Sequence, residues 1–126
     1  GEGGWIVTGD LNDHDADDEQ GPTSLRELLD WPAAENVVER LPEGERWTHF
    51  FRGSHRHGLP HAYRQLDYLL LSRRLAALNP GAPTIERRGQ PKRAERFEGE
   101  RFPGIGRDRP KASDHCPVCI DIDTMP

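Results

Sequence analysis

A carboxylate and a carboxamide follow an apolar run near the start of the chain. In "IVTGDLNDHDADDEQGP", residues 6–22, Asp10 and Asn12 come directly behind Ile6 and Val7. Residues two apart in extended backbone point the same way, so both side chains would face one site just past a strand end. Their oxygens suit Mg²⁺, or they could accept a proton from water beside a donor for a phosphate oxygen. A plain Asx-type turn after a strand would use the same residues.

The rest of this acidic loop does not fit a calcium site. An EF-hand loop needs oxygen ligands at its odd positions, Gly at the sixth position and Glu at the twelfth. A loop that starts at Asp13 has Asp18 and Ser24 at those two positions, and a loop that starts at Asp10 fails at the same two. We therefore expect a solvated loop made by Asp13, Asp15, Asp17, Asp18 and Glu19.

A second carboxylate stands inside the most apolar stretch, "AYRQLDYLLLS", residues 62–72. An ionised carboxylate that is buried without a partner costs several kcal/mol, so Asp67 requires a cation or an imidazole unless it lies at a sheet edge. Asp114 and His115 precede the last predicted strand, and His115 offers the imidazole. Asp114 could bind a metal ion, and Asp67 would orient the His115 ring as a base or a phosphate contact. For His115 taken alone, a structural role is the preferred interpretation.

The elements that must position these residues indicate an α/β domain. Apolar patterns and breakers predict strands at residues 5–8, 46–51, 62–72 and 117–123, a helix from an N-cap at Thr23 through Asp30, a short element from Val37, and a helix over 73–78. Residues 79–112, dominated by Pro, Gly and Arg, are predicted to form a long loop, either a surface loop or partly disordered. The order of elements predicts one domain over residues 1–126 with a mixed β-sheet and flanking helices.

Composition limits what this chain can bury. A length of 126 residues suits one domain, but 33% hydrophobic against 31% charged residues is a thin apolar supply, so we expect the chain to need a partner. Residues 1–45 carry 2 basic and 13 acidic side chains, whereas residues 46–111 carry 15 basic and 6 acidic ones. These segments provide for metal-assisted chemistry on a polyanion, or they are two solvated faces that attract each other.

Three other groups of residues are weaker candidates. Cys116 and Cys119 lie three apart in a predicted strand and would face opposite ways, which argues against a redox or zinc pair. A transition-metal site could use His49, His55, His57 and His61, which we expect in a polar turn. A nucleic-acid path could use Arg87, Arg88, Lys92, Arg93, Arg96, Arg101, Arg107 and Arg109, although Glu86, Glu95, Glu98, Glu100 and Asp108 interleave with them and a salt-bridged loop is the alternative.

The two ends of the sequence add little. No apolar run is long enough to span a membrane. The chain opens with "GEGGWIV", a predicted strand almost at the first residue, which is typical of a piece of a longer protein, and localisation cannot be read from it.

Three motifs in order, "GDLND", "QLDYLLLS" and "ASDHCPV", resemble the C-terminal half of the endonuclease/exonuclease/phosphatase family. These metal-dependent phosphoesterases include apurinic endonucleases, pancreatic-type deoxyribonuclease, sphingomyelinases and inositol phosphatases. The resemblance covers residues 5 to about 123, and "RWTHFF" stands where the family has a Thr beside aromatic residues. It implies the C-terminal half of a four-layered α/β/β/α sandwich.

The same resemblance implies a role for each of five residues. Asp10 would orient or deprotonate the attacking water, and Asn12 would hold the water or the phosphate. Asp67 would orient His115, which would contact the scissile phosphate. Asp114, with Asp10 and Asn12, would bind Mg²⁺ or Mn²⁺. The substrate would be a phosphodiester, with nucleic acid as the first choice.

One departure limits the resemblance. The family takes an Asn and a Glu metal ligand from an N-terminal half that these 126 residues do not contain. We therefore expect this chain alone to be a poor catalyst with an apolar sheet face, which the missing half or a swapped homodimer would cover. A phosphatase or phospholipase with the same site, and a non-catalytic interaction module, are the alternatives.

Overall fold

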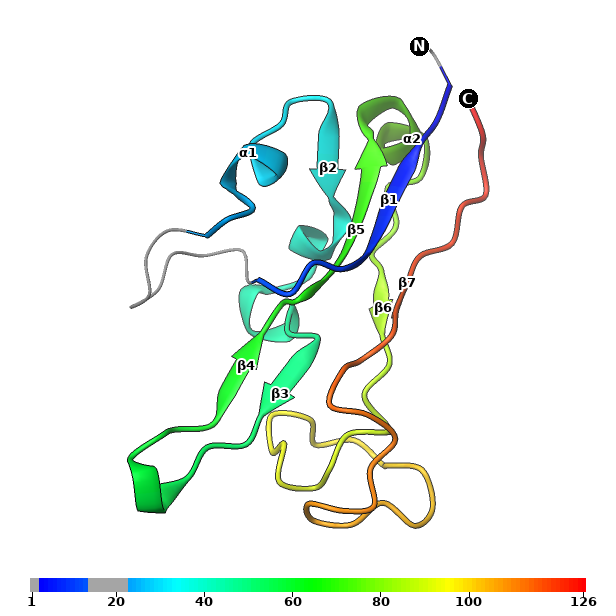
Figure 1. The fold of residues 1–126 in the computed structure, drawn as a ribbon. Helices are drawn as coiled ribbons and strands as arrows, with labels where there is room; N and C mark the ends of the chain where they lie inside the picture. The colour runs from blue at the N-terminus through cyan, green and yellow to red at the C-terminus, as the bar shows by residue number, and fades with distance from the viewer. Residues whose placement is uncertain (1–2, 14–22) are drawn as a thin grey trace.

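The computed structural model describes residues 3–13 and 23–126 (Figure 1). The predicted solvated loop at Asp15, Asp17, Asp18 and Glu19 lies outside the described residues. The elements in chain order are β1 (Ile6–Asp10), α1 (Arg26–Leu29), β2 (Ala34–Asn36), β3 (His49–Phe51), β4 (Ala62–Arg64), β5 (Asp67–Ser72), α2 (Arg73–Leu78), β6 (Thr84–Ile85) and β7 (Val118–Cys119). Three short 3-10 helices cover Val37–Arg40, Glu43–Glu45 and His55–His57.

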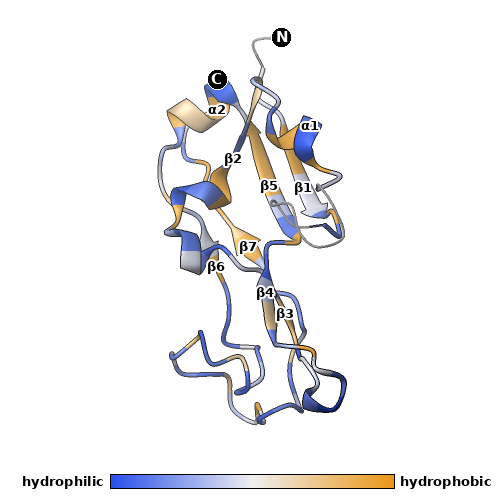
Figure 2. Ribbon diagram, turned by 90° about the vertical axis from the view of Figure 1, so that its left-hand side faces the viewer, coloured by the Kyte–Doolittle hydropathy of each residue, from blue (hydrophilic) through white to orange (hydrophobic). Residues whose placement is uncertain are grey.

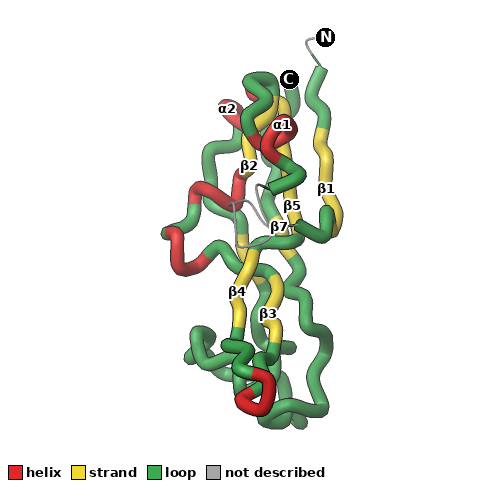
Figure 3. Tube along the Cα trace, turned by 60° about the vertical axis from the view of Figure 1, so that its left-hand side comes forward, coloured by secondary structure: helices red, strands yellow, loops and turns green. Residues whose placement is uncertain are grey.

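The molecule has an upper and a lower part in the view of Figure 1. The upper part holds the sheet β1-β5-β2 with α1 and α2, and the lower part holds the β3–β4 hairpin and the long loop that leads from β6 toward β7. Helices and strands together make an α/β fold in the general sense. Figure 3 shows that most of the lower part is loop.

The main sheet is antiparallel, whereas a mixed sheet was expected. β5 lies between β1 and β2 and pairs antiparallel with both, and the β3–β4 and β6–β7 pairs are antiparallel too. The prediction was wrong for the described strands because β5 inserts between two strands that run in the same direction. In this register Asp10 lies directly opposite Asp67.

The predicted strand over residues 62–72 is broken into two strands. The Thr48 hydroxyl, fully buried, accepts hydrogen bonds from the backbone N–H groups of Leu66 and Asp67, each at 3.0 Å. These N–H groups are therefore lost to strand pairing, and the chain passes from the lower hairpin to the upper sheet at this point. The prediction of one continuous strand was wrong, but the prediction of burial holds, because all residues of β5 after Asp67 are buried.

Two small apolar clusters stabilise the fold. One, in the upper part, is made by Val37, Leu69, Leu71, Leu75 and Ala76, and the other, in the lower part, by Trp47, Phe50, Ala94 and Cys116. Figure 2 shows apolar residues along the strands of the upper part and mostly hydrophilic residues in the lower loops. This division agrees with the small apolar content of the sequence.

The last predicted strand is shorter than expected. β7 contains only Val118 and Cys119, because its partner β6 offers only two residues. The predicted alternation is present beyond it, since Val118, Ile120 and Ile122 pack against the upper cluster. Both cysteines are free, Cys116 buried and Cys119 exposed, which confirms that they face different surroundings.

The helices follow the predictions in part. α2 spans Arg73–Leu78 as expected. α1 begins later than the predicted N-cap: its N-cap is Leu25, whose backbone N–H donates to the Thr23 hydroxyl at 3.2 Å. The short element predicted from Val37 is a 3-10 helix capped by the Asn36 side chain. No helix in the described part of the chain is long and apolar enough to cross a membrane.

The predicted long loop over residues 79–112 contains the two-residue strand β6 and is packed. Gln90 and Ala94 are buried, and the Arg101 guanidinium donates hydrogen bonds to the backbone carbonyls of Gln90, Pro91 and Ala94. Arg87 does the same for the carbonyls of Glu45 and Trp47. These arginines therefore tie the loop to the lower part, where partial disorder was one of the two expectations.

Candidate active site

The site centres on one carboxylate and one imidazole. His115 Nδ1 lies 2.8 Å from Asp67 Oδ2, which is the contact predicted from the sequence. Asp67 is the first residue of β5, directly after the turn held by the Thr48 hydroxyl. The predicted partner of this carboxylate is therefore present.

His115 is positioned by the edge of β3. The segment that contains it runs antiparallel to β3: Phe50 N donates to Asp114 O at 3.1 Å, and Cys116 N donates to Thr48 O at 2.7 Å. A β-bridge pairs His49 with His115. Backbone hydrogen bonds from a neighbouring strand thus hold the ring close to Asp67.

Buried Gln90 holds the same segment from its other side. Its carboxamide nitrogen donates to the backbone carbonyls of Ser113 at 3.1 Å and of His115 at 3.3 Å. Gln90 is 1% exposed. No sequence pattern indicated this role, because Gln90 lies in a loop without periodicity, 25 positions before His115.

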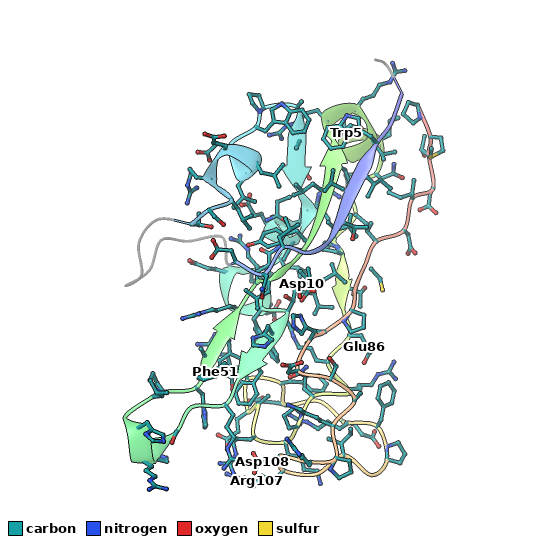
Figure 4. The ribbon with its side chains drawn as sticks, in the orientation of Figure 1. Trp5, Asp10, Phe51, Glu86, Arg107 and Asp108 are labelled. Carbon is teal, nitrogen blue, oxygen red and sulfur yellow. The ribbon has the colours of Figure 1, made fainter. Side chains whose placement is uncertain are left out.

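Asp10 completes the centre from β1. It faces Asp67 across the strand pair, and its Oδ2 lies 3.8 Å from His115 Nε2. Figure 4 places Asp10 at the end of β1, between the upper and lower parts. Directly opposed residues of an antiparallel pair share one face of the sheet, where like charges repel each other. The His115 imidazole therefore stands between two carboxylates that would otherwise destabilise each other.

This arrangement changes the pKa of His115. Burial lowers the pKa, but the hydrogen bond to Asp67 and the negative charges of Asp67, Asp10 and Asp114 outweigh burial, so the pKa of His115 is raised above its ordinary value. The ring consequently keeps its proton to higher pH. In the charged form Nδ1 donates to Asp67 and Nε2 has a proton to donate elsewhere.

A second imidazole lies beside the centre. His49 Nε2 is 3.3 Å from Asp114 Oδ2, and the ring centroids of His49 and His115 are 4.7 Å apart. Burial raises the pKa of Asp114, but its own backbone N–H and the His49 hydrogen bond lower it, and the net pKa is below the ordinary value. The sequence grouped His49 with the turn histidines, but only His55 and His57 lie in the 3-10 helix of the turn, and His61 accepts from Gly53 N–H.

Asn12 is beside the centre but does not join it through its side chain. Its backbone N–H donates to the Asp10 carboxylate at 2.8 Å, and its φ of 57° lies in the left-handed region. Within residues 3–13 and 23–126 the Asn12 carboxamide makes no hydrogen bond. This is the Asx-type turn that was the alternative to a ligand role.

Two exposed carboxylates lie near His115. The side chains of Asp10 and Asp114 are 45% and 51% exposed. Mg²⁺ is commonly held by one or two carboxylates and keeps several of its waters, which requires such solvent access. Among the described residues, two groups have ligand atoms within 4.8 Å of one another: Asp10 with Asp67 and His115, and His49 with Asp114 and His115.

Most of the arginines proposed for a nucleic-acid path are engaged within the lower part. Arg88 pairs with Glu86, Arg93 with Asp108 and Arg107 with Glu95, three ion pairs of which Figure 4 labels Glu86, Asp108 and Arg107. The Arg88 hydrogen bonds lower the pKa of Glu86 to about 2. The salt-bridged loop, which was the alternative, therefore describes these residues better.

Comparison of the chain with protein-family models, with curated proteins and with solved structures found no match. Any functional assignment therefore rests on the residues of the site and on their geometry.

Proposed function

We propose that this chain is part of a divalent-metal-dependent phosphodiester hydrolase of the endonuclease/exonuclease/phosphatase type, with nucleic acid as the first substrate class. The observation that carries the proposal is the single imidazole between two carboxylates: His115 Nδ1 is 2.8 Å from Asp67, and Nε2 is 3.8 Å from Asp10. The motifs of the sequence implied the same three residues.

The distance between His115 Nε2 and Asp10 Oδ2 supports phosphodiester hydrolysis between these two groups. A separation of 3.8 Å is too long for a hydrogen bond, so both groups keep a free polar atom toward the same space. A charged His115 would donate to a phosphate oxygen there. Asp10 would accept a proton from the attacking water, and Asp67 would hold the ring in place.

The proposed cofactor is Mg²⁺ or Mn²⁺. Asp10 and Asp114 would hold it through their exposed carboxylates, and Asn12 would add its carboxamide oxygen by a side-chain rotation. When bound, the ion would neutralise the charge that builds up on the phosphate and on the leaving oxygen.

The proposal also covers the finer architecture. In a four-layered sandwich the described three-stranded sheet would pack on a second sheet from a preceding half. All residues of β1 are exposed, as expected of a strand that lacks such a neighbour. Residues 1–126 alone are then expected to be a poor catalyst, because the preceding half would supply an Asn and a Glu ligand.

The test is a substrate panel in Mg²⁺, run on residues 1–126 and on the full-length polypeptide that carries them. Plasmid nicking, phosphate release from inositol phosphates and phospholipid hydrolysis separate the substrate classes. Asp10→Asn should lower the rate about 10²- to 10⁴-fold in the full-length polypeptide, which is the usual contribution of a general acid or base. Asp121→Asn, an exposed carboxylate that lines a pocket with Leu78 and Asn79, serves as the control.

The outcomes discriminate between the functions. Activity that survives Asp10→Asn would contradict the proposed role of the site, and preference for an inositol phosphate or a lipid would change the substrate class. A full-length polypeptide without any phosphoesterase activity would favour the interaction module.

A further inference from the structure

Two imidazoles and one carboxylate meet where β3 begins. His49, Asp114 and His115 each offer a ligand atom within 4.8 Å of the other two. His49 Nε2 and Asp114 Oδ2 are 3.3 Å apart. Two ligands about 2.0–2.1 Å from one tetrahedral ion are about 3.4 Å apart, so this pair already has the spacing of two ligands of a single ion.

The third ligand atom is also oriented. His115 Nδ1 is engaged by Asp67, so Nε2, which lies 3.8 Å from Asp10 Oδ2, is the ring nitrogen left to an ion. A carboxylate behind the second nitrogen is the usual partner of a metal-binding histidine, because it fixes the tautomer and the ring orientation. Asp67 is such a carboxylate, because it contacts Nδ1, the ring nitrogen of His115 that would not bind the ion.

The backbone holds the three residues in position without the ion. His49 and His115 are partners in a β-bridge, and Phe50 N donates to Asp114 O on the same edge. The side chains of His49 and His115 are 16% and 31% exposed, so the group is partly shielded but still reachable from solvent.

We propose that His49, Asp114 and His115 bind a transition-metal ion of the Zn²⁺ class. Imidazole nitrogens suit Zn²⁺ and Co²⁺, whereas Mg²⁺ prefers oxygen ligands and gains little from two rings. Two imidazoles and one carboxylate also match the three-ligand sets that leave further positions to water. This site and the proposed Mg²⁺ site share Asp114. The other two ligands here are imidazoles, whereas those of the Mg²⁺ site are the side-chain oxygens of Asp10 and Asn12.

The site has a regulatory consequence that rests on the proposed function. A bound Zn²⁺ would occupy His115 Nε2, the atom that the proposed hydrolysis uses, so micromolar Zn²⁺ would inhibit the reaction in the presence of excess Mg²⁺. The binding itself does not depend on that function.

Cobalt provides a direct probe of binding. Co²⁺ is titrated into residues 1–126 while its visible d–d absorption is recorded, and Zn²⁺ and Mg²⁺ are then added in competition. We expect Co²⁺ to saturate at one ion per chain, Zn²⁺ to abolish the bands, and equimolar Mg²⁺ to leave them unchanged.

Variants locate the site. His49→Phe keeps an aromatic ring of similar size and should weaken Co²⁺ binding more than tenfold, whereas the matched control His57→Phe, in the exposed turn, should leave it unchanged. His115→Gln removes a second ligand, on the segment before β7, and should weaken Co²⁺ binding as much as His49→Phe does. It keeps the test valid if His49→Phe fails to fold. Asp67→Asn should weaken binding about 10- to 100-fold through the loss of ring orientation.

Equal Co²⁺ affinity in wild type, His49→Phe and His115→Gln would overturn this proposal, as would an equal loss in His57→Phe. Zinc X-ray absorption supplies an independent readout, in which fewer than two imidazole ligands would also contradict the proposal. Because binding is measured without turnover, Co²⁺ binding through His49 in a polypeptide that includes the proposed preceding half but has no phosphoesterase activity would reject the proposed hydrolase and keep this site.

Discussion

At the scale of single residues, the central feature is the position of His115 between two carboxylates. Asp10 and Asp67 lie opposite each other in the β1–β5 pair, an arrangement that costs free energy when both are charged. The imidazole relieves this repulsion when it carries a proton. Stability and the proposed chemistry therefore depend on the same charged ring.

This dependence predicts how stability changes with pH. The folded-state pKa of His115 is raised above its ordinary value of 6.5, so its contribution is fully present below about pH 6.5 and is lost as pH rises through the folded-state pKa. In metal-free buffer, His115→Gln should lower the melting temperature most at acidic pH and progressively less above neutrality. Thermal unfolding of both proteins over a pH series measures this difference.

The control for this series is His57→Gln, which removes an exposed imidazole from the β3–β4 turn and should stay close to wild type at each pH. A difference between His115→Gln and wild type that grows as pH rises would contradict the proposed charge state.

At the scale of elements, the site depends on the junction between β4 and β5. Apolar content predicted a strand over residues 62–72, but the break is made by a hydroxyl 18 positions away from Leu66, at Thr48. The partner of His49, Asp114, is 65 positions away. Local sequence patterns predicted α2 and the burial of β5. The Asp67–His115 contact, 48 positions apart, was predicted from the carboxylate in an apolar strand and from the order of the motifs, whereas nothing in the sequence indicated the strand switch or the role of His49.

The junction predicts a specific effect of Thr48→Val. Valine has nearly the shape of threonine but leaves the N–H groups of Leu66 and Asp67 without an acceptor. A buried donor left unsatisfied costs about 1–3 kcal/mol, so urea denaturation should show a loss of that order. Thr48→Ser retains the hydroxyl and should lose less, and equal losses in both variants would show that the hydroxyl is not the cause.

The β3–β4 hairpin predicts a second effect on stability. A Cβ at Gly53 would collide with the carbonyl oxygen of Leu59, a backbone atom that cannot move without opening the hairpin. Gly53→Ala should therefore destabilise the fold by about 1–3 kcal/mol, as overpacking does. Gly44→Ala meets nothing within 4 Å and should be neutral or stabilising by about 0.4–1 kcal/mol in the same denaturation experiment.

At the scale of the whole molecule, two kinds of expectation had different outcomes. The α/β character agrees with the helices and strands of the fold, and the small hydrophobic share of the sequence agrees with its two small apolar clusters. The charge pattern of the sequence did not show that Arg87 and Arg101 donate to backbone carbonyls, because that depends on the path of the long loop. A residue count therefore overstated the basic surface open to a nucleic acid.

The exposed strand β1 predicts association. Ile6 is 49% exposed and Val7 37% exposed, and among the described strands β1 pairs with β5 alone, on one edge. Apolar side chains beside an unpaired strand edge favour pairing with another chain. Sedimentation velocity should show concentration-dependent association of residues 1–126, which Ile6→Lys should reduce. A monomer at all concentrations, with full Mg²⁺-dependent activity, would contradict the expectation that the sheet needs a second half.

The most direct test of the central claim, that Asp67 acts through His115 in phosphodiester hydrolysis, is a double-mutant cycle on kcat/KM in Mg²⁺ with a polypeptide that includes the proposed preceding half. Asp67→Asn and His115→Gln should each lower kcat/KM at least about 100-fold, and the double variant should be little worse than His115→Gln alone, because groups that act as one unit are not additive. Losses that multiply in the double variant, or single variants that keep the wild-type kcat/KM, would contradict the claim.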